Sequence, residues 1–414
     1  MAGQTITASG LGGLEALRLY EEVLAPACIS VDHPRFLAFV PTAPTEAATL
    51  FDLVVGAGSI FGGSWLEGSG AVYAENQALR WLSDLAGLPT TAGGVFVPGG
   101  TMGNLSALVA ARYRWRSHDS NRERLRGILI AGGGAHSSIA SAARVMDVDL
   151  IKIPTDHRGR TSAEATRATV AALSPTERHR VFAVMATGGT TNVGVVDDLE
   201  AAANAAEELD VWFHVDCAYG GAALAAPSVR PLFQGIERCD SFVVDPHKWL
   251  FAPYDCCALI YREPLIAQAA HTQHAEYLDV LHNPADLEWN PSDFAVHLTR
   301  RARGLPFWFS LATYGTNRYS AANEASITLA RQSAELIRHH QHIELLLEPE
   351  LSIVIFRRVG WTPAQYEAWS DKLLADGTAF VVPSAWNGET VLRFCFINPR
   401  TTFADVELII DSLR

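Results

Sequence analysis

Residues 241–250 read Ser-Phe-Val-Val-Asp-Pro-His-Lys-Trp-Leu, and this stretch decides how the fold is interpreted. It begins with a largely apolar run that predicts a buried strand, and Lys248 follows shortly after. Burial disfavours the charged form of a lysine, so we expect a lowered pKa and a nucleophilic amine. A carbonyl could then form an imine with Lys248, and pyridoxal phosphate, an electron sink for carbanions, is the obvious candidate. The alternative is a surface lysine that happens to follow a strand.

The composition is that of a globular protein. The chain has 414 residues, of which 49% are hydrophobic and 19% charged, and this length suits a large domain with a smaller one. The formal net charge of −13 argues against nucleic acid or an anionic membrane surface as a partner. The sequence contains neither a membrane span nor a signal-peptide pattern. Its six cysteines form no CxxC pair, so we expect free thiols and a cytoplasmic location.

Strands and helix-length segments alternate through the middle of the chain. This alternation predicts βαβ units and a mainly parallel sheet, whose strands read as continuous apolar runs because both faces are buried. The segment between Cys217 and Cys239 is long enough for a crossover helix. The expected strands cover residues 93–97, 127–131, 181–186, 211–216 and 241–244, and the expected helices cover residues 105–115 and 198–209.

The pattern changes after about residue 300, where a long helical region precedes short strands and helices. This pattern predicts a small α+β domain with an antiparallel sheet. We expect helices over residues 303–340, over 363–375 and after Thr402, with strands at 351–356, 380–382 and 391–396. The expected division is an N-terminal arm with helices (1–60), a large cofactor-binding domain (61–305) and a small C-terminal domain (306–414).

Two glycine turns follow predicted strands, at the edge where a parallel sheet places its ligands. In Pro98-Gly99-Gly100-Thr101 the glycines allow a tight turn, and the helix that follows offers free N–H groups to an anion. Thr187-Gly188-Gly189-Thr190-Thr191 carries hydroxyls that could reach a phosphate. A Walker lysine is missing from the first turn, so a nucleoside triphosphate is not favoured. A plain structural turn is the alternative for each.

Two further polar residues follow strands of the same sheet. A carboxylate at Asp216 is poorly placed unless it meets a cation or a ligand N–H. A pyridine nitrogen fits, because the anion keeps that nitrogen protonated. His136 follows a strand and three glycines, and it could lie flat on an aromatic cofactor. A capping role is the alternative for both residues, but together with Lys248 they predict a single pyridoxal-phosphate site.

The chain resembles the group II pyridoxal-phosphate-dependent amino-acid decarboxylases, the family of aromatic amino-acid, histidine and glutamate decarboxylases. The Asp-Pro-His-Lys-Trp and His-Val-Asp-x-Ala-Tyr motifs are highly specific. The matching segments are His33-Pro34-Arg35-Phe36, Gly62-Gly63-Ser64-Trp65, Gly99-Gly100-Thr101, His136-Ser137-Ser138, Gly189-Thr190-Thr191, His214-Val215-Asp216-Cys217-Ala218-Tyr219-Gly220 and Asp245-Pro246-His247-Lys248-Trp249.

The resemblance implies an α/β fold of the type I aspartate-aminotransferase-like class, with a mainly parallel seven-stranded sheet flanked by helices and a small α+β C-terminal domain. It also implies a homodimer with active sites near the subunit interface. Lys248 would form the internal aldimine, Asp216 would contact the pyridine nitrogen and His136 would stack on the ring. The other cofactor contacts that it implies are Gly100, Thr101, Thr191, Asp245 and His247 around the phosphate, and Ala218 on the second ring face.

The implied reaction is decarboxylation of an L-amino acid to its amine through a quinonoid. The side-chain pocket of aromatic-specific members matches Phe39, Phe61 and Trp65, so an aromatic or large apolar amino acid is expected. Gly63 stands where those members carry a bulky ring, which would leave more room. Ordinary core packing is the alternative for these aromatic residues.

The chain departs from the family pattern in three places. The arm before His33 is shorter than the usual dimer-clasping segment. Asp245 stands where some members have Asn, so near a phosphate it needs a proton, a donor neighbour or another orientation. The loop tyrosine that donates a proton in the family falls at about Pro291, and Tyr277 could replace it only if the loop folds differently.

The missing loop tyrosine keeps other functions open. Oxygen-dependent oxidative deamination to an aldehyde is the main alternative, followed by another lyase or transferase reaction on the same cofactor. A binding module on an inactive fold is disfavoured, because Lys248, Asp216 and His136 are all present.

Two groups of residues elsewhere are candidates for other roles. His271 and His274, like the histidines at 339, 340 and 342, lack further ligands in a fixed geometry, so we expect solvated faces and no metal. Arg300 and Arg301 are candidates either for binding a carboxylate or for pairing with acidic residues.

Overall fold

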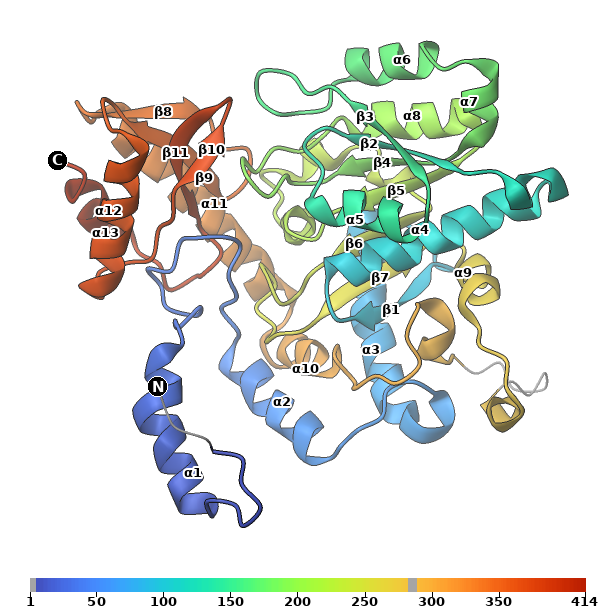
Figure 1. The fold of residues 1–414 in the computed structure, drawn as a ribbon, viewed down its shortest axis with the longest axis horizontal. Helices are drawn as coiled ribbons and strands as arrows, with labels where there is room; N and C mark the ends of the chain where they lie inside the picture. Colours follow the sequence, from blue (N-terminus) through green and yellow to red (C-terminus); the bar gives the residue numbers. More distant parts are fainter. Residues whose placement is uncertain (1–4, 282–288) are drawn as a thin grey trace.

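The computed structural model describes residues 5–281 and 289–414 (Figure 1). A seven-stranded sheet forms the centre of the larger part, in the order β1-β7-β6-β5-β4-β2-β3. The pairs from β3 to β6 are parallel, whereas β7 pairs antiparallel with both β6 and β1, so the prediction of a mainly parallel sheet is confirmed. The strands are β1 (Gly93–Val97), β2 (Ile128–Gly132), β3 (Asp149–Ile153), β4 (Val181–Thr187), β5 (Trp212–Asp216), β6 (Ser241–Val244) and β7 (Cys257–Tyr261).

Helices pack against this sheet, and α4 is the one that builds the site. It runs over Gly100–Ser117 and begins five residues (105 − 100) before the predicted start, at the glycine turn itself. A Cβ on Gly103 would lie 2.7 Å from Cγ1 of Val243, so glycine lets α4 approach β6 closely. The remaining helices of this part are α5 (Ser137–Val145), α6 (Ala163–Ala171), α7 (Pro175–Arg180), α8 (Leu199–Leu209), α9 (Pro264–His271), η3 (Ser120–Arg124), η7 (Glu276–Leu281) and η8 (Pro291–Phe294).

The predicted crossover helix between Cys217 and Cys239 is wrong. This segment forms three short 3-10 helices instead, η4 (Gly220–Ala225), η5 (Arg230–Phe233) and η6 (Ile236–Arg238). A Cβ on Gly220 would lie 2.1 Å from the carbonyl oxygen of Gly188, so the chain must pass close to the neighbouring turn. Pro227 and Pro231 also interrupt the segment, and proline is unfavourable inside an α-helix.

The C-terminal part contains a four-stranded antiparallel sheet, in the order β10-β11-β9-β8, as predicted for the small α+β domain. The predicted strand at 380–382 is wrong, because Phe380 makes only an isolated bridge to Phe36. The long helical region is two helices, broken at Gly315, whose φ of 76° lies in the left-handed region that favours glycine. The elements are α10 (Leu305–Tyr314), α11 (Thr316–Arg338), β8 (Ile343–Leu347), β9 (Ile353–Arg358), α12 (Pro363–Ala375), β10 (Ser384–Trp386), β11 (Glu389–Cys395) and α13 (Phe403–Asp411).

Helix α1, close to the N-terminus, projects from the rest of the chain (Figure 1). Helix α1 has no buried residue, and its leucines Leu14 and Leu17 are exposed. In the part of the chain that the structure describes, no helix is long and apolar enough to cross a membrane. The helices that precede β1 are α1 (Gly13–Leu19), η1 (Tyr20–Leu24), η2 (Ala25–Ala27), α2 (Glu46–Ala57) and α3 (Trp65–Ala86).

Candidate active site

A cavity of about 350 Å³ lies at the carboxyl ends of the central strands. Strands β4, β5 and β6 lead into it, and the first turn of α4 forms another wall. The nine residues predicted to be catalytic or to bind the cofactor all line this one cavity. They are Gly100, Thr101, His136, Thr191, Asp216, Ala218, Asp245, His247 and Lys248.

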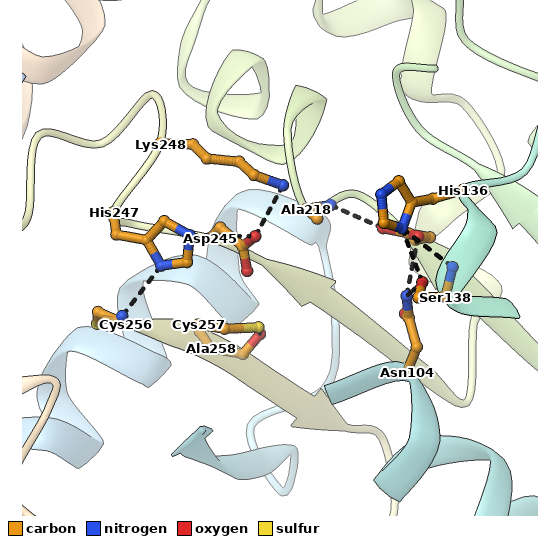
Figure 2. Close-up of polar contacts among 11 residues, drawn as sticks. Asn104, His136, Ser138, Ala218, Asp245, His247, Lys248, Cys256, Cys257 and Ala258 are labelled. Carbon is orange, nitrogen blue, oxygen red and sulfur yellow. Dashed lines mark hydrogen bonds and ion pairs between the residues drawn. The ribbon is translucent and has the colours of Figure 1, made fainter. Parts of the chain in front are cut away.

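Lys248 forms an ion pair with Asp245 inside the cavity. Its Nζ lies 2.8 Å from Oδ2 of Asp245, and Figure 2 shows the amine directed at that carboxylate. Burial by itself lowers the pKa of Lys248, but the attraction of Asp245 and of Asp216 outweighs burial and raises it. The predicted lowering of the pKa is therefore wrong, because two carboxylates face the amine. Lys248 must give up a proton before it can attack a carbonyl.

Asp245 has the donor neighbours that its position requires. Burial favours its neutral form, yet Lys248 and His247 together lower the pKa of Asp245 below its usual value. Nε2 of His247 lies 3.6 Å from Oδ2 of Asp245, and Nδ1 of His247 accepts a hydrogen bond from the backbone N–H of Cys256. Asp245 is therefore an ionised group whose charge is balanced by Lys248.

Asp216 lies at the end of β5 and is 4% exposed. Its Oδ2 accepts a hydrogen bond from Nδ2 of Asn104 at 2.9 Å, and its Oδ1 accepts one from the backbone N–H of Ala218 at 3.0 Å. Among the described residues Asp216 forms no salt bridge. A buried carboxylate held only by neutral donors is a strong acceptor for a protonated ring nitrogen.

His136 occupies the N-cap position of α5, the capping role that was the alternative. Its Nδ1 accepts a hydrogen bond from the backbone N–H of Ser138 at 3.2 Å and lies 3.0 Å from the Ser138 hydroxyl. Nδ1 is thus an acceptor, and the proton of a neutral ring is on Nε2. Capping and cavity lining are compatible, because the cap uses only one ring nitrogen.

The predicted substrate residues are not gathered in this cavity. Phe39 lies near its rim, since Arg393 donates hydrogen bonds to both the Phe39 carbonyl and the Thr191 carbonyl. Phe61 bridges to Arg301 and Trp65 begins α3, and neither lines the cavity. The space left by Gly63 is filled, because a Cβ there would lie 2.4 Å from Cζ of Phe61.

Several cavity residues escaped the sequence interpretation. Asn104 is 1% exposed and faces the sheet from α4, but the helix was predicted to begin only at residue 105. Tyr254 follows the lysine motif, lines the cavity and is about half exposed, with its ring centroid 5.0 Å from that of His247. Other lining residues that were missed are Ser138, Tyr219 and Asp255.

Pro291 occupies the position expected for the loop tyrosine, and the arginine pair that follows it forms ion pairs within the chain. Pro291 is buried at the start of η8, while residues 282–288 and the Tyr277 side chain lie outside the described part. Arg300 and Arg301 pair with acidic residues of this chain, Glu75 and Asp52 respectively.

The prediction that His271 lies on a solvated face is wrong. His271 is buried, and its Nε2 contacts the Ser106 carbonyl oxygen at 3.0 Å.

The cavity has the chemical features that pyridoxal phosphate requires. The N-cap of α4, Gly99, has no side-chain hydrogen bond, so the first N–H groups of an eighteen-residue helix are free to meet a phosphate. A Cβ on Gly100 would lie 3.0 Å from Cβ of Ala218, so a larger residue would narrow the space between them. Oγ1 of Thr187 is buried without a protein partner among the described residues. An anion cradle, an amine and a buried carboxylate together define a pyridoxal-phosphate enzyme.

Comparison with known proteins identifies the family. The model for the pyridoxal-dependent decarboxylase conserved domain matches residues 14–359, and the chain belongs to this family. It is 30% identical to the aromatic-L-amino-acid decarboxylase of Bacillus atrophaeus, over 99% of this chain and 87% of that protein. It is also 30% identical to the L-2,4-diaminobutyrate decarboxylase of Rhizobium meliloti, over 92% of this chain and 78% of that protein.

A solved structure supports the same assignment. The crystal structure of Oryza sativa TDC with PLP and tryptamine superposes with a TM-score of 0.89 at 27% identity, and covers all of this chain and 89% of that one. The protein is therefore a pyridoxal-phosphate-dependent amino-acid decarboxylase with the predicted α/β fold and cofactor.

Proposed function

We propose that this enzyme decarboxylates an aromatic or large apolar L-amino acid to its amine. The observation that carries the proposal is the meeting of Lys248, Asp216 and His136 in one cavity beside an uncapped helix N-terminus. The name of the Bacillus atrophaeus relative supports an aromatic substrate. The rim position of Phe39, which is 59% exposed, supports a pocket that accepts a large side chain.

Each cavity residue has a proposed role. When bound, pyridoxal phosphate supplies an electron sink at the substrate Cα. Lys248 would hold the cofactor covalently and later release the product, and Asp216 would keep the ring nitrogen protonated. His136 and Ala218 would hold the ring between them. The first turn of α4, with Thr101, Thr191, His247 and the Asp245–Lys248 pair, surrounds the phosphate end.

The proton that replaces the carboxylate is proposed to come from Tyr254. Its hydroxyl has no hydrogen-bond partner in the described residues, and its side chain lines the cavity together with Lys248. Partial burial raises the pKa of Tyr254 although Lys248 opposes this, so the phenol is protonated at neutral pH. Carbon dioxide leaves, the electron pair stays with the substrate, and the phenol proton forms the new Cα–H bond. The phenolate then regains a proton from water.

The proposed assembly is a homodimer. Apolar side chains are exposed on α1, which projects from the chain, and on α2, and this is unusual unless a partner covers them. The exposed residues are Leu14, Leu17, Tyr20 and Leu24 on the first helices and Leu50, Leu53 and Val54 on α2. Sedimentation of the purified protein tests this part, and replacing Leu14 and Leu17 with Glu is expected to yield monomers.

A panel of L-amino acids tests the proposed reaction. The purified holoenzyme is incubated with aromatic, aliphatic and 2,4-diaminobutyrate substrates, and carbon dioxide, amine, aldehyde, ammonia and peroxide are measured. One carbon dioxide and one amine per aromatic substrate support the proposal. Ammonia and peroxide in place of amine would exclude simple decarboxylation, and turnover of diaminobutyrate alone would exclude the aromatic substrate class.

A further inference from the structure

A continuous chain of buried hydrogen bonds runs from Trp212 to the carboxylate of Asp216. Nε1 of Trp212 donates to Oγ of Ser241 at 2.8 Å, and this hydroxyl lies 2.8 Å from Nδ1 of His214. Nε2 of His214 lies 2.9 Å from Oδ1 of Asn104. Nδ2 of Asn104 then donates to Asp216 at 2.9 Å. Trp212, Ser241, His214 and Asn104 are each at most 1% exposed.

The same amide also reaches the second functional residue. Nδ2 of Asn104 lies 3.3 Å from Oγ of Ser138, and that hydroxyl lies 3.0 Å from Nδ1 of His136. Figure 2 shows Asn104, Ser138 and His136 grouped on one side of the site, opposite Lys248. One buried amide therefore contacts the carboxylate directly and the imidazole through a single hydroxyl.

The direction of every bond in this chain follows from the donor inventory. The amide nitrogen of Asn104 must face the acceptor-only carboxylate, so its oxygen faces His214. An amide oxygen only accepts, which places the His214 proton on Nε2. Burial lowers the pKa of His214 to about 4, so the ring is neutral and Nδ1 accepts from the Ser241 hydroxyl. Ser241 in turn accepts from Trp212, and each donor meets one acceptor.

We propose that Asn104 and His214 are positioning residues for the cofactor ring. His214 prevents the Asn104 amide from flipping, and the amide fixes the Asp216 carboxylate against the ring nitrogen. Through Ser138 the same amide holds the His136 ring with Nε2 free on the cavity side. The inference rests on the proposed contact between Asp216 and the ring nitrogen. In this role neither Asn104 nor His214 contacts the reacting atoms. Each acts through another residue.

A fixed orientation matters energetically, because the buried Asp216 carboxylate can bind the ring nitrogen well only when its oxygens are held in place. Ala218 holds Oδ1 of Asp216 and Asn104 holds Oδ2, so removing the amide leaves one oxygen without a donor. Hydrogen bonds to charged groups contribute about 1.5–3 kcal/mol, which corresponds to about a tenfold to hundredfold change in affinity. We expect the loss of affinity to be much larger for a ligand that carries the ring nitrogen than for one that lacks it.

The test compares two cofactors that differ at one atom. Apo-protein is titrated with pyridoxal phosphate and with its deaza analogue, in which carbon replaces the pyridine nitrogen, and the ratio of the two dissociation constants is measured. Wild type is expected to prefer pyridoxal phosphate. His214→Leu and Asn104→Asp are expected to reduce this preference by about tenfold or more, with a much smaller change in affinity for the deaza analogue.

Two further variants separate positioning from folding. His214→Gln keeps a side-chain N–H donor for Asn104 and is expected to retain most of the preference. Ser106→Ala is the matched control, because Ser106 is buried on the same helix but its hydroxyl accepts from the backbone N–H of Val296 outside the chain of bonds. Circular dichroism and thermal unfolding of each apo-protein confirm the fold.

The outcomes distinguish this inference from the assignment on which it rests. If folded His214→Leu and Asn104→Asp keep the wild-type preference, the positioning role is wrong. If Ser106→Ala loses the preference as much as they do, the effect is general destabilisation and the role is equally wrong. If wild type and Asp216→Asn do not differ in preference, Asp216 does not contact the ring nitrogen, and both the assignment and the inference fall.

Discussion

His214 and Ser241 are register partners in the parallel strands β5 and β6, and their side chains meet at 2.8 Å in the interior of the sheet. The strand register therefore supplies the buried hydroxyl that contacts Nδ1 of His214, while burial keeps the ring neutral with its proton on Nε2. This contact joins the core of the sheet to Asp216, two residues further along β5. The orientation of the Asp216 carboxylate therefore depends on the packing of the sheet.

The Asp245–Lys248 ion pair predicts a shift in the pH dependence of cofactor binding. Replacing Asp245 with Asn removes the carboxylate that raises the pKa of Lys248, so burial then lowers that pKa. More of the amine is neutral at a given pH, and the midpoint for development of the yellow imine colour should move to lower pH. The measurement is visible absorbance of apo-protein mixed with pyridoxal phosphate across a pH series.

A nearby acidic residue provides the control for this shift. Asp255 lines the same cavity but pairs with Arg303 instead of Lys248, so Asp255→Asn should leave the midpoint unchanged. An unchanged midpoint in Asp245→Asn would contradict the proposed control of Lys248. Lys248→Ala should remain colourless at every pH.

Tyr254→Phe tests the proposed proton donor. Removing the hydroxyl should slow amine formation by about 10²-fold or more, the usual contribution of a positioned general acid, while cofactor affinity changes little. Longer-lived carbanion character should also increase the fraction of aldehyde and peroxide in air. Product ratios are measured with and without oxygen. Full amine production by the Phe variant would assign the proton to another group.

Most of the fold could be predicted from the sequence because the central strands are buried on both faces. The fully buried strands β2, β4, β5 and β6 were found within one residue at each end. Strand β3 was missed because it lies at the sheet edge, is only partly buried and contains Lys152. Strand β7 follows the lysine motif so closely that its pairing between β6 and β1 could not be inferred locally.

Some residues of the candidate site could likewise be predicted from the sequence, and others could not. Lys248, Asp216 and His136 follow strands, so the rule for parallel sheets places them together. Asn104 and Ser241 could not be recognised, because their importance depends on which buried neighbour each one meets. Likewise, the pKa of Lys248 depends on the side-chain distance to Asp245, which the sequence does not define.

The buried ion pair between Glu75 and Arg300 predicts a large loss of stability. Both Arg300 amino groups lie 2.8 Å from Glu75 oxygens, and Oε1 of Glu75 also accepts from the backbone N–H of Gly304 at 2.7 Å. Glu75→Gln leaves a buried guanidinium without its charge partner, which costs about 3–5 kcal/mol. Urea denaturation measures the loss.

The more exposed pair of Arg301 and Asp52 is the comparison for this prediction. Because solvent screens it, Asp52→Asn should cost less than about 1 kcal/mol. Equal losses for Glu75→Gln and Asp52→Asn would contradict the argument from burial.

His214 predicts an acid-sensitive contribution to stability with a defined sign. Burial lowers its pKa from 6.5 to about 4 in the folded state, so the unfolded chain takes up a proton first as the pH falls. Stability from this residue is therefore complete above pH 6.5 and is lost between about pH 6.5 and 4. Between pH 7.5 and 5 the loss should be about 2 kcal/mol.

Comparing the wild type with His214→Gln isolates the contribution of His214 to the pH dependence of stability. Asp197 acts in the opposite direction, because burial raises its pKa to about 6 and its folded form binds a proton more readily than the unfolded chain. Asp197 is present in both proteins, so subtracting their unfolding free energies removes its contribution. Urea unfolding of the two apo-proteins at pH 7.5 and 5 should show the difference between them shrinking at the lower pH. A difference that stays constant would mean that folding does not lower the pKa of His214, and the argument that burial keeps this ring neutral would be wrong.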